Sequence, residues 1–194
     1  MKKLNGMKSR ILFFIGTGIF MFTGCEKKEN NSTEYAELTK ALAKAWEVVN
    51  DNMPGTELYE ISGDKINTDG TAAEGWSFYF NKTDETDGYC VRVYPDGEVF
   101  DYDLGWDAML AISDYTSADA AEWVRVADES APWIDHDQTY RELQVRSEDS
   151  DINFYPQTTD YVILFYKPDD GGEPVTYVEI EAYDYEVLFV EPNP

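Results

Sequence analysis

Residues 89–106 read YCVRVYPDGEVFDYDLGW, and this stretch decides the fold class. Val91 and Val93 alternate with other residues, which is the two-residue period of a strand with one buried face. A Pro-Asp-Gly turn follows, and the next run alternates again, with Phe100 and Tyr102 on one face. The sequence therefore predicts an antiparallel hairpin, in which Phe100 and Tyr102 share the inward face of Val91 and Val93.

The residues upstream extend this hairpin into a sheet with one helix. Trp76, Phe78 and Phe80 alternate with Ser77, Tyr79 and Asn81, and the polar residues 83–88 predict a loop that joins this run to the next. Residues 58–61 predict a short strand, and residues 65–74 contain turn material. Residues 34–50 predict a helix, because their apolar residues recur at helical spacing: Leu38, Ala41, Leu42, Ala45 and Val49. We expect an α+β fold in which this helix packs on one face of an antiparallel meander.

The second half of the chain has the same order of elements. Thr116 and Asp119 have the spacing of a capping box, and a helical face follows as far as Ala131-Pro132. Strands are predicted at residues 140–145, 162–166, 177–182 and 186–190. A shift of 87 places Val91, Val93, Phe100 and Tyr102 over Val178, Ile180, Val187 and Phe189. We expect two tandem repeats, 34–106 and 107–194; the alternative is one larger α+β domain.

The helix and the motifs of residues 89–106 carry a family resemblance. A strand, an Asp-Gly-x-Val turn, a second strand and a Gly-Trp pair resemble the repeating unit of PepSY-like lipoproteins and the related β-lactamase-inhibitor-like fold. In the second half, Tyr-Asp-Tyr-Glu at residues 183–186 replaces the Asp-Gly turn. The resemblance implies a small α+β binding or inhibitory module on an exported protein.

The N-terminus predicts export. Residues 1–24 contain four basic residues and no acid, and the apolar run 11–22 is about the length of a signal-peptide core, shorter than the roughly 20 residues of a membrane span. The run ends in Phe-Thr-Gly-Cys, which resembles the lipobox of bacterial lipoproteins and implies cleavage before Cys25 and acylation of that residue. The alternative is an ordinary secretory signal in which Cys25 is incidental.

The residues after the expected cleavage site predict a tether. Residues 26–33, EKKENNST, contain no apolar side chain and are typical of a flexible linker. We thus expect residues 25–33 to hold the folded part off a membrane, in the bacterial cell envelope, facing the periplasm or the exterior. The only other cysteine is Cys90, so acylation of Cys25 would leave no intramolecular disulfide.

The charge excludes one class of partner. Net charge is −24 for the whole chain and becomes −28 when residues 1–24 are removed. Binding to nucleic acid regardless of sequence rests on Lys and Arg that neutralise phosphates, so we expect no nucleic-acid partner.

Candidate catalytic and metal-binding residues are few. His136 is the only histidine, and it lies in a polar loop without a nucleophile motif, so we expect no enzyme, no cofactor and no metal centre. Pairs of carboxylates for glycoside hydrolysis do not stand out among 39 acidic residues. Residues 101–107 space carboxylates as calcium loops do, but Ile112 stands where the bidentate Glu belongs, which favours a strand with solvated acids.

Aromatic residues give the one candidate binding surface. Tyr79, Arg92 and Tyr94, with Cys90, fall on the strand face opposite Phe78 and Val91. If the helix covers the latter face, the former is open and suits contact with a protein or a glycan. The alternative is that the two repeats pack against each other there.

These observations predict a membrane-anchored, non-enzymatic binding or inhibitory module for another exported protein. A carbohydrate- or calcium-binding surface lipoprotein is the alternative, and a hydrolase or its inhibitor is a third possibility.

Overall fold

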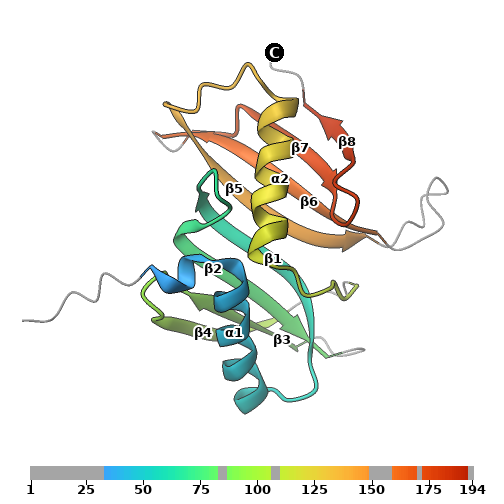
Figure 1. Cartoon of the computed structure of the whole chain (residues 1–194). Helices are drawn as coiled ribbons and strands as arrows, with labels where there is room; N and C mark the ends of the chain where they lie inside the picture. The colour runs from blue at the N-terminus through green and yellow to red at the C-terminus, as the bar shows by residue number, and fades with distance from the viewer. Residues whose placement is uncertain (1–32, 83–86, 106–109, 149–158, 170–171, 192–194) are drawn as a thin grey trace, which may run out of the picture.

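The computed structural model describes residues 33–82, 87–105, 110–148, 159–169 and 172–191 (Figure 1). The predicted signal peptide and nearly all of the predicted tether, with Cys25, lie outside these residues, as do residues 106–107 of the acidic stretch 101–107. Within the described part, no helix is both long and apolar enough to cross a membrane.

The chain forms an α+β fold with two α-helices and one antiparallel sheet of eight strands. The elements are the 3-10 turn η1 (Glu34–Ala36), α1 (Leu38–Asn52), β1 (Glu57–Ile66), β2 (Ala72–Asn81), β3 (Asp87–Val93), β4 (Val99–Gly105), α2 (Ser117–Ser130), β5 (Thr139–Glu148), β6 (Thr159–Pro168), β7 (Thr176–Glu181) and β8 (Val187–Val190). The strand order is β4-β3-β2-β1-β5-β6-β7-β8. The α+β prediction is confirmed.

Both helices occur where their apolar spacing predicted them. The predicted apolar face of α1 is buried, and the helix begins at Leu38 because Glu37 before it is extended (φ −73°, ψ 127°). At α2, the side chain of Thr116 accepts from the backbone N–H of Asp119, and the Asp119 carboxylate accepts from the backbone N–H of Thr116. The predicted capping box is confirmed, and it satisfies backbone donors that a helix start leaves free.

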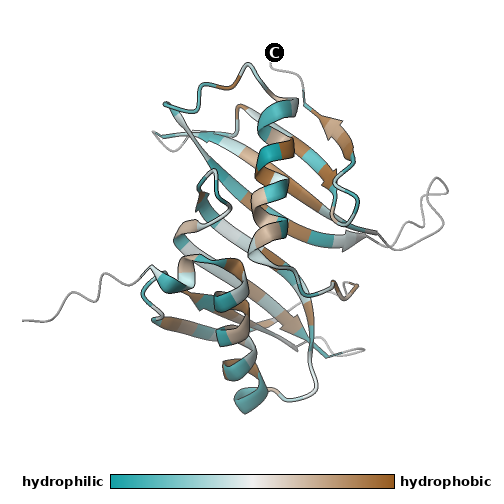
Figure 2. Ribbon diagram, in the orientation of Figure 1, coloured by the Kyte–Doolittle hydropathy of each residue, from teal (hydrophilic) through white to brown (hydrophobic). Residues whose placement is uncertain are grey.

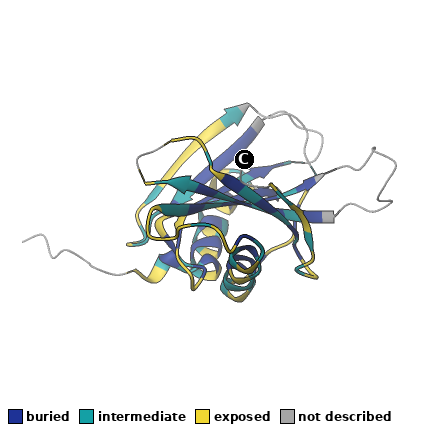
Figure 3. Ribbon diagram, turned by 90° about the horizontal axis from the view of Figure 1, so that it is seen from above, coloured by how far each residue is buried: buried dark blue, intermediate teal, exposed yellow. Residues whose placement is uncertain are grey.

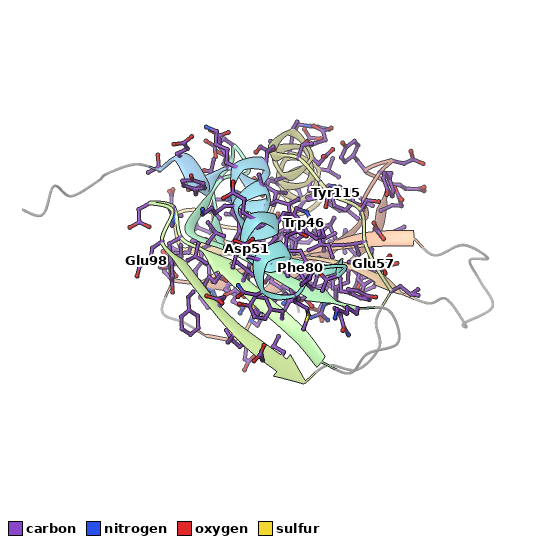
Figure 4. All side chains as sticks on the ribbon, turned by 90° about the horizontal axis from the view of Figure 1, so that it is seen from below. Trp46, Asp51, Glu57, Phe80, Glu98 and Tyr115 are labelled. Atoms are coloured by element: carbon purple, nitrogen blue, oxygen red, sulfur yellow. The ribbon has the colours of Figure 1, made fainter. Side chains whose placement is uncertain are left out.

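The core lies between the helices and one face of the sheet. Figure 3 shows both helices on the same side of the sheet, and Figure 2 shows hydrophilic residues along their outer sides. Trp46 of α1 meets Phe80 of β2 edge-on, with ring centroids 4.7 Å apart, which seats α1 on β2 (Figure 4). Trp76 and Trp123 are fully buried, and their indole N–H groups donate to the carbonyls of Ala36 and Ala182. Both large side chains are therefore packed without an unpaired donor.

The N-terminal turns of the two helices contact each other. The backbone N–H of Thr39 donates to the Ser117 hydroxyl at 3.1 Å, and the backbone N–H of Ser117 donates to the Thr39 hydroxyl at 2.9 Å. Each helix thus supplies an acceptor for the free first-turn donor of the other.

The centre of the sheet is the pairing of β1 with β5. Ile61 lies opposite Phe78 of β2 on one side and Val145 of β5 on the other. β1 and β2 are longer than predicted, because they continue into the expected turn region 65–74 and leave only residues 67–71 as the turn. Gly70 in this turn has φ +77°, and a Cβ there would lie 2.4 Å from the backbone nitrogen of Ala121 in α2. The turn therefore packs directly on the second helix.

One predicted face is wrong. Phe100 lies opposite Arg92 and Tyr102 lies opposite Cys90, so both point away from Val91 and Val93. Phe100 is 56% exposed and Tyr102 39% exposed. The inward positions of this edge strand are instead Val99 and the solvated Asp101 and Asp103, because the edge extends beyond the area that α1 covers. The shift of 87 therefore relates β3 to β7 but does not keep the inward face from β4 to β8.

Candidate functional site

The candidate site is the face of the sheet turned away from the helices, which we call the open face. α1 packs on the side of Phe78 and Val91, as expected. None of the elements described lies over the other side (Figure 3), where the predicted Tyr79, Arg92 and Tyr94 are half-buried. The two halves meet edge to edge through β1 and β5, so the alternative of two halves stacked on this face is wrong.

Arg92, near the end of β3, is held by three contacts. Its Nη2 donates to Asp64 Oδ2 at 2.7 Å and to the backbone oxygen of Glu74 at 3.2 Å. Its guanidinium lies 5.3 Å from the ring centroid of Tyr94, a cation–π distance. The structure thus brings Arg92 and Tyr94 together and neutralises the Arg92 charge with Asp64.

Tyr79 belongs to a neighbouring row across four strands. Cross-strand pairing places Glu60, Tyr79, Cys90 and Tyr102 side by side. Cys90 is only 1% exposed, and burial raises the pKa of its thiol, although hydrogen bonds with Tyr102 and Tyr79 oppose the shift. Burial likewise raises the pKa of Tyr79. The row is therefore neutral at Cys90 and Tyr79, and the thiol is not an activated nucleophile.

Glu60 carries the buried charge of this row. The residue is 3% exposed, and its Oε2 accepts from Arg146 Nε at 3.0 Å across the pairing of β1 with β5. Burial raises the pKa of Glu60, and Arg146 partly offsets that effect. The pair therefore joins the two halves of the open face.

The second half of the open face carries an aromatic stack that sequence reasoning missed. The rings of Phe165 and Tyr177 are 6.0 Å apart and those of Tyr177 and Phe189 are 5.5 Å apart. Lys167 on the same face forms an ion pair with Glu142. The signal was present, because residues that alternate with the buried Val162, Leu164 and Tyr166 must point to the other face.

The open face therefore combines aromatic rings with internally paired charges. Its aromatic residues are Tyr79, Tyr94, Phe100, Tyr102, Tyr140, Tyr161, Phe165, Tyr177 and Phe189. Four cations on this face have carboxylate partners: Arg92 with Asp64, Arg146 with Glu60, Lys167 with Glu142, and Lys65, which lies over the Tyr140 ring, with Glu74. Such a surface can lose water without leaving those cations unpaired.

His136 belongs to a polar cluster at the end of α2. Asp128 accepts from Arg141 Nε at 2.8 Å, from Arg141 Nη2 at 2.6 Å and from the Tyr166 hydroxyl at 2.8 Å. His136 Nδ1 lies 3.1 Å from Arg141 Nη2, and Arg141 Nη1 reaches the backbone oxygen of Ile66 at 3.4 Å. This geometry ties α2 to β5 and to the end of β1, and it places His136 beside Arg141 and Asp128.

The acidic loops form no metal centre in the described part. Among the described residues, no group of three or more His, Cys, Asp or Glu side chains could hold a metal ion. Asp101 accepts from the Tyr89 hydroxyl, and Asp160 accepts from the Tyr115 hydroxyl at 2.7 Å and from the backbone N–H of Ser113 at 3.0 Å. These carboxylates are engaged in structural hydrogen bonds.

Comparison of the chain with protein-family models, with curated proteins and with solved structures finds no match.

Proposed function

We propose that the chain is a non-enzymatic binding module, anchored to a membrane of the bacterial envelope, that binds another exported protein through its open face. The observation that carries this proposal is the aromatic composition of the face, with four of its cations paired. Tyr, Phe and Arg are enriched at the centres of protein interfaces, where rigid rings bury much area at low entropic cost.

The size of the open face fits this role. Its eight strands give seven strand spacings of about 4.8 Å, so the face is roughly 34 Å across. A standard interface takes about 800 Å² from each partner, a patch of similar width. Two exposed phenylalanines add apolar rings that a protein partner can bury: Phe100 is 56% and Phe189 44% exposed.

The anchor is a separate part of the proposal. The lipobox at Cys25 and the polar residues 26–33 support cleavage, acylation and a tether, and stable anchoring takes more than one acyl chain. Cys25→Ser should abolish lipid labelling and move the protein from the membrane fraction to the soluble fraction. Unchanged fractionation of this variant would refute the anchor.

The chain is also proposed to contain two PepSY-like repeats, residues 34–106 and 107–194. The order of elements supports this, because each part has one helix followed by four strands paired in sequence. The reciprocal hydrogen bonds of Thr39 and Ser117 relate the two helix starts in the same way.

The experiment for the binding function uses matched surface variants. The mature chain, residues 25–194, is immobilised and exposed to an envelope extract, beside Phe100→Ser/Phe189→Ser. Trp133→Ser is the control, because Trp133 is 45% exposed but lies in the loop after α2. We expect the double variant to retain less than a tenth of a captured protein and the control to retain all of it.

Two results would contradict the proposal. Equal capture of the same proteins by the double variant would remove the open face from the function. Binding to a purified polysaccharide on a glycan array, with loss in the double variant, would favour the carbohydrate alternative.

A further inference from the structure

The edge strand β4 differs from the edge strand β8 at the other end of the sheet. β8 has four residues, and its pairing with β7 contains a register irregularity. β4 has seven residues, VFDYDLG, and its pairing with β3 runs without a shift from Gly105 to Val99. Proteins protect sheet edges with short strands, bulges, prolines, lysines or inward-pointing charges, and of these devices β4 has only the charges of Asp101 and Asp103 on its helix side.

The hydrogen-bond register fixes which backbone groups of β4 face outward. The backbone N–H of Tyr94 donates to the Glu98 oxygen at 2.9 Å, so Tyr94 and Glu98 form a hydrogen-bonded pair next to the end of β3 and the start of β4. In an antiparallel ladder hydrogen-bonded and non-hydrogen-bonded pairs alternate, so every second residue of β4 after Glu98 is hydrogen-bonded to β3. Phe100 and Tyr102 are in that set. The N–H and C=O groups of Val99, Asp101 and Asp103 therefore point away from β3, toward the free edge.

The side chains of β4 sort into two chemistries. Phe100 and Tyr102 lie on the open face, with ring centroids 5.5 Å apart. Asp101 and Asp103 lie on the helix side and are exposed. A strand added to this edge would meet aromatic rings on one face and carboxylates on the other.

We propose that β4 binds an extended segment of a partner protein as an added antiparallel strand, and that this segment alternates apolar and basic residues. Its apolar residues pack on Phe100 and Tyr102, and its Lys or Arg side chains pair with Asp101 and Asp103. The net charge of −24 attracts such a segment. A second copy of this chain is disfavoured, because antiparallel pairing of two β4 edges with matched faces brings carboxylates together.

This inference rests on the proposed binding function and adds the outer backbone edge of β4 to the open-face rings Phe100 and Tyr102. Its test changes the backbone of the peptide and of β4 and leaves those rings unchanged, so it can fail or succeed separately from the open-face test. The probe is the acetylated and amidated peptide Lys-Val-Lys-Val-Lys-Val-Lys in two N-methylated forms. In the added strand, the residues opposite Asp101 and Asp103 lie on the same face as these aspartates, so they are the lysines. Because the backbone groups of Asp101 and Asp103 point toward the added strand, the lysine amides opposite them point toward β4, and the valine amides point away. N-methylation at valine thus leaves pairing intact, and N-methylation at lysine blocks it.

Binding is measured with the mature chain by calorimetry at low and moderate salt. We expect the valine-methylated peptide to bind at least ten times more tightly than the lysine-methylated peptide. Asp103→Asn should weaken binding several-fold and reduce its salt dependence. Asp103→Pro should weaken it at least tenfold, since this N–H makes no bond to β3 and proline is tolerated there. Glu186→Gln, beside the other edge, is the control and should bind like the wild type, and circular dichroism confirms that each variant is folded.

Three outcomes would overturn the inference. Equal binding of the two peptides would show that charge alone attracts them, and full binding by Asp103→Pro would exclude the β4 backbone. A dimer in sedimentation that Asp103→Pro dissociates would make a second copy the occupant. If envelope capture fails while the peptide selectivity holds, the open-face function is wrong and the edge inference stands.

Discussion

The ion pair between Asp128 and Arg141 gives the sharpest test of how the second helix is held. Asp128 accepts two hydrogen bonds from Arg141 and one from Tyr166, at 2.6–2.8 Å. The Arg141 side chain is only 9% exposed, so Asp128→Ala leaves a nearly buried guanidinium without its counter-charge. Removing one partner of a buried pair costs about 3–5 kcal/mol.

The expected magnitude lies at the lower end of that range. The Asp128 side chain is 23% exposed, so water can replace part of the lost carboxylate. We expect Asp128→Ala to lower the free energy of unfolding by about 3 kcal/mol, because water at Asp128 offsets part of the buried-pair cost. For a domain of this size, that loss lowers Tm by roughly 6–12 °C.

The assay is urea unfolding followed by tryptophan fluorescence, with a thermal melt beside it. Glu129→Ala on the next residue is the control, because Glu129 is 65% exposed in its pair with Arg125 and should cost at most about 0.5 kcal/mol. The double variant Asp128→Leu/Arg141→Met should recover most of the lost stability. A loss below about 1 kcal/mol in Asp128→Ala would refute the view that this pair fixes α2 to the sheet.

Three further predictions concern buried or capping groups. Burial raises the pKa of Glu60 above its ordinary value of 4.5, so the wild type should gain stability relative to Glu60→Gln as the pH falls from 7 to 4.5. This gain should be lost as the pH rises through the folded-state pKa. Urea unfolding at both pH values checks this, and a stability difference that does not change with pH would contradict it. Asp119→Ala removes the acceptor for the Thr116 backbone N–H and for the Tyr185 hydroxyl at 2.7 Å. It should lower the free energy of unfolding by about 1–2 kcal/mol in the same assay, and an unchanged free energy would exclude the cap as a stabilising element. Cys90 should react with iodoacetamide only after unfolding, since its thiol is buried and neutral; modification of the folded protein within minutes, detected by mass spectrometry, would count against the described packing.

Local pattern predicted most elements of this fold. The apolar spacing from Leu38 to Val49 and the capping box at Thr116 specify helices through neighbours in sequence. Alternation around Phe78 and Val91 specifies strands in the same way. These signals need no knowledge of distant residues, so they are readable from the sequence.

The errors arose where distant contacts decide. Alternation places Phe100 and Tyr102 on one face of their strand, but it does not say which face the helix covers. Because both residues are aromatic, the sequence predicts the helix side, whereas the structure has them on the open face. The pairing of β1 with β5 has no local signal in Ile61 or Val145. The sequence therefore predicts the candidate face at Tyr79, Arg92 and Tyr94, but it does not predict that this face continues through Tyr177 and Phe189.

The pairing of β1 with β5 also determines how the chain can be divided. A fragment ending at residue 106 would keep α1 and β1–β4 but expose the β1 edge over residues 61–64 and strip Arg146 from the buried Glu60. The complementary fragment would expose the matching edge of β5. Each fragment alone is expected to aggregate, because an unprotected edge beside apolar surface recruits other strands. Mixed during refolding, the two fragments should reassemble along this pairing, so the continuous sheet is itself a two-piece complementation system.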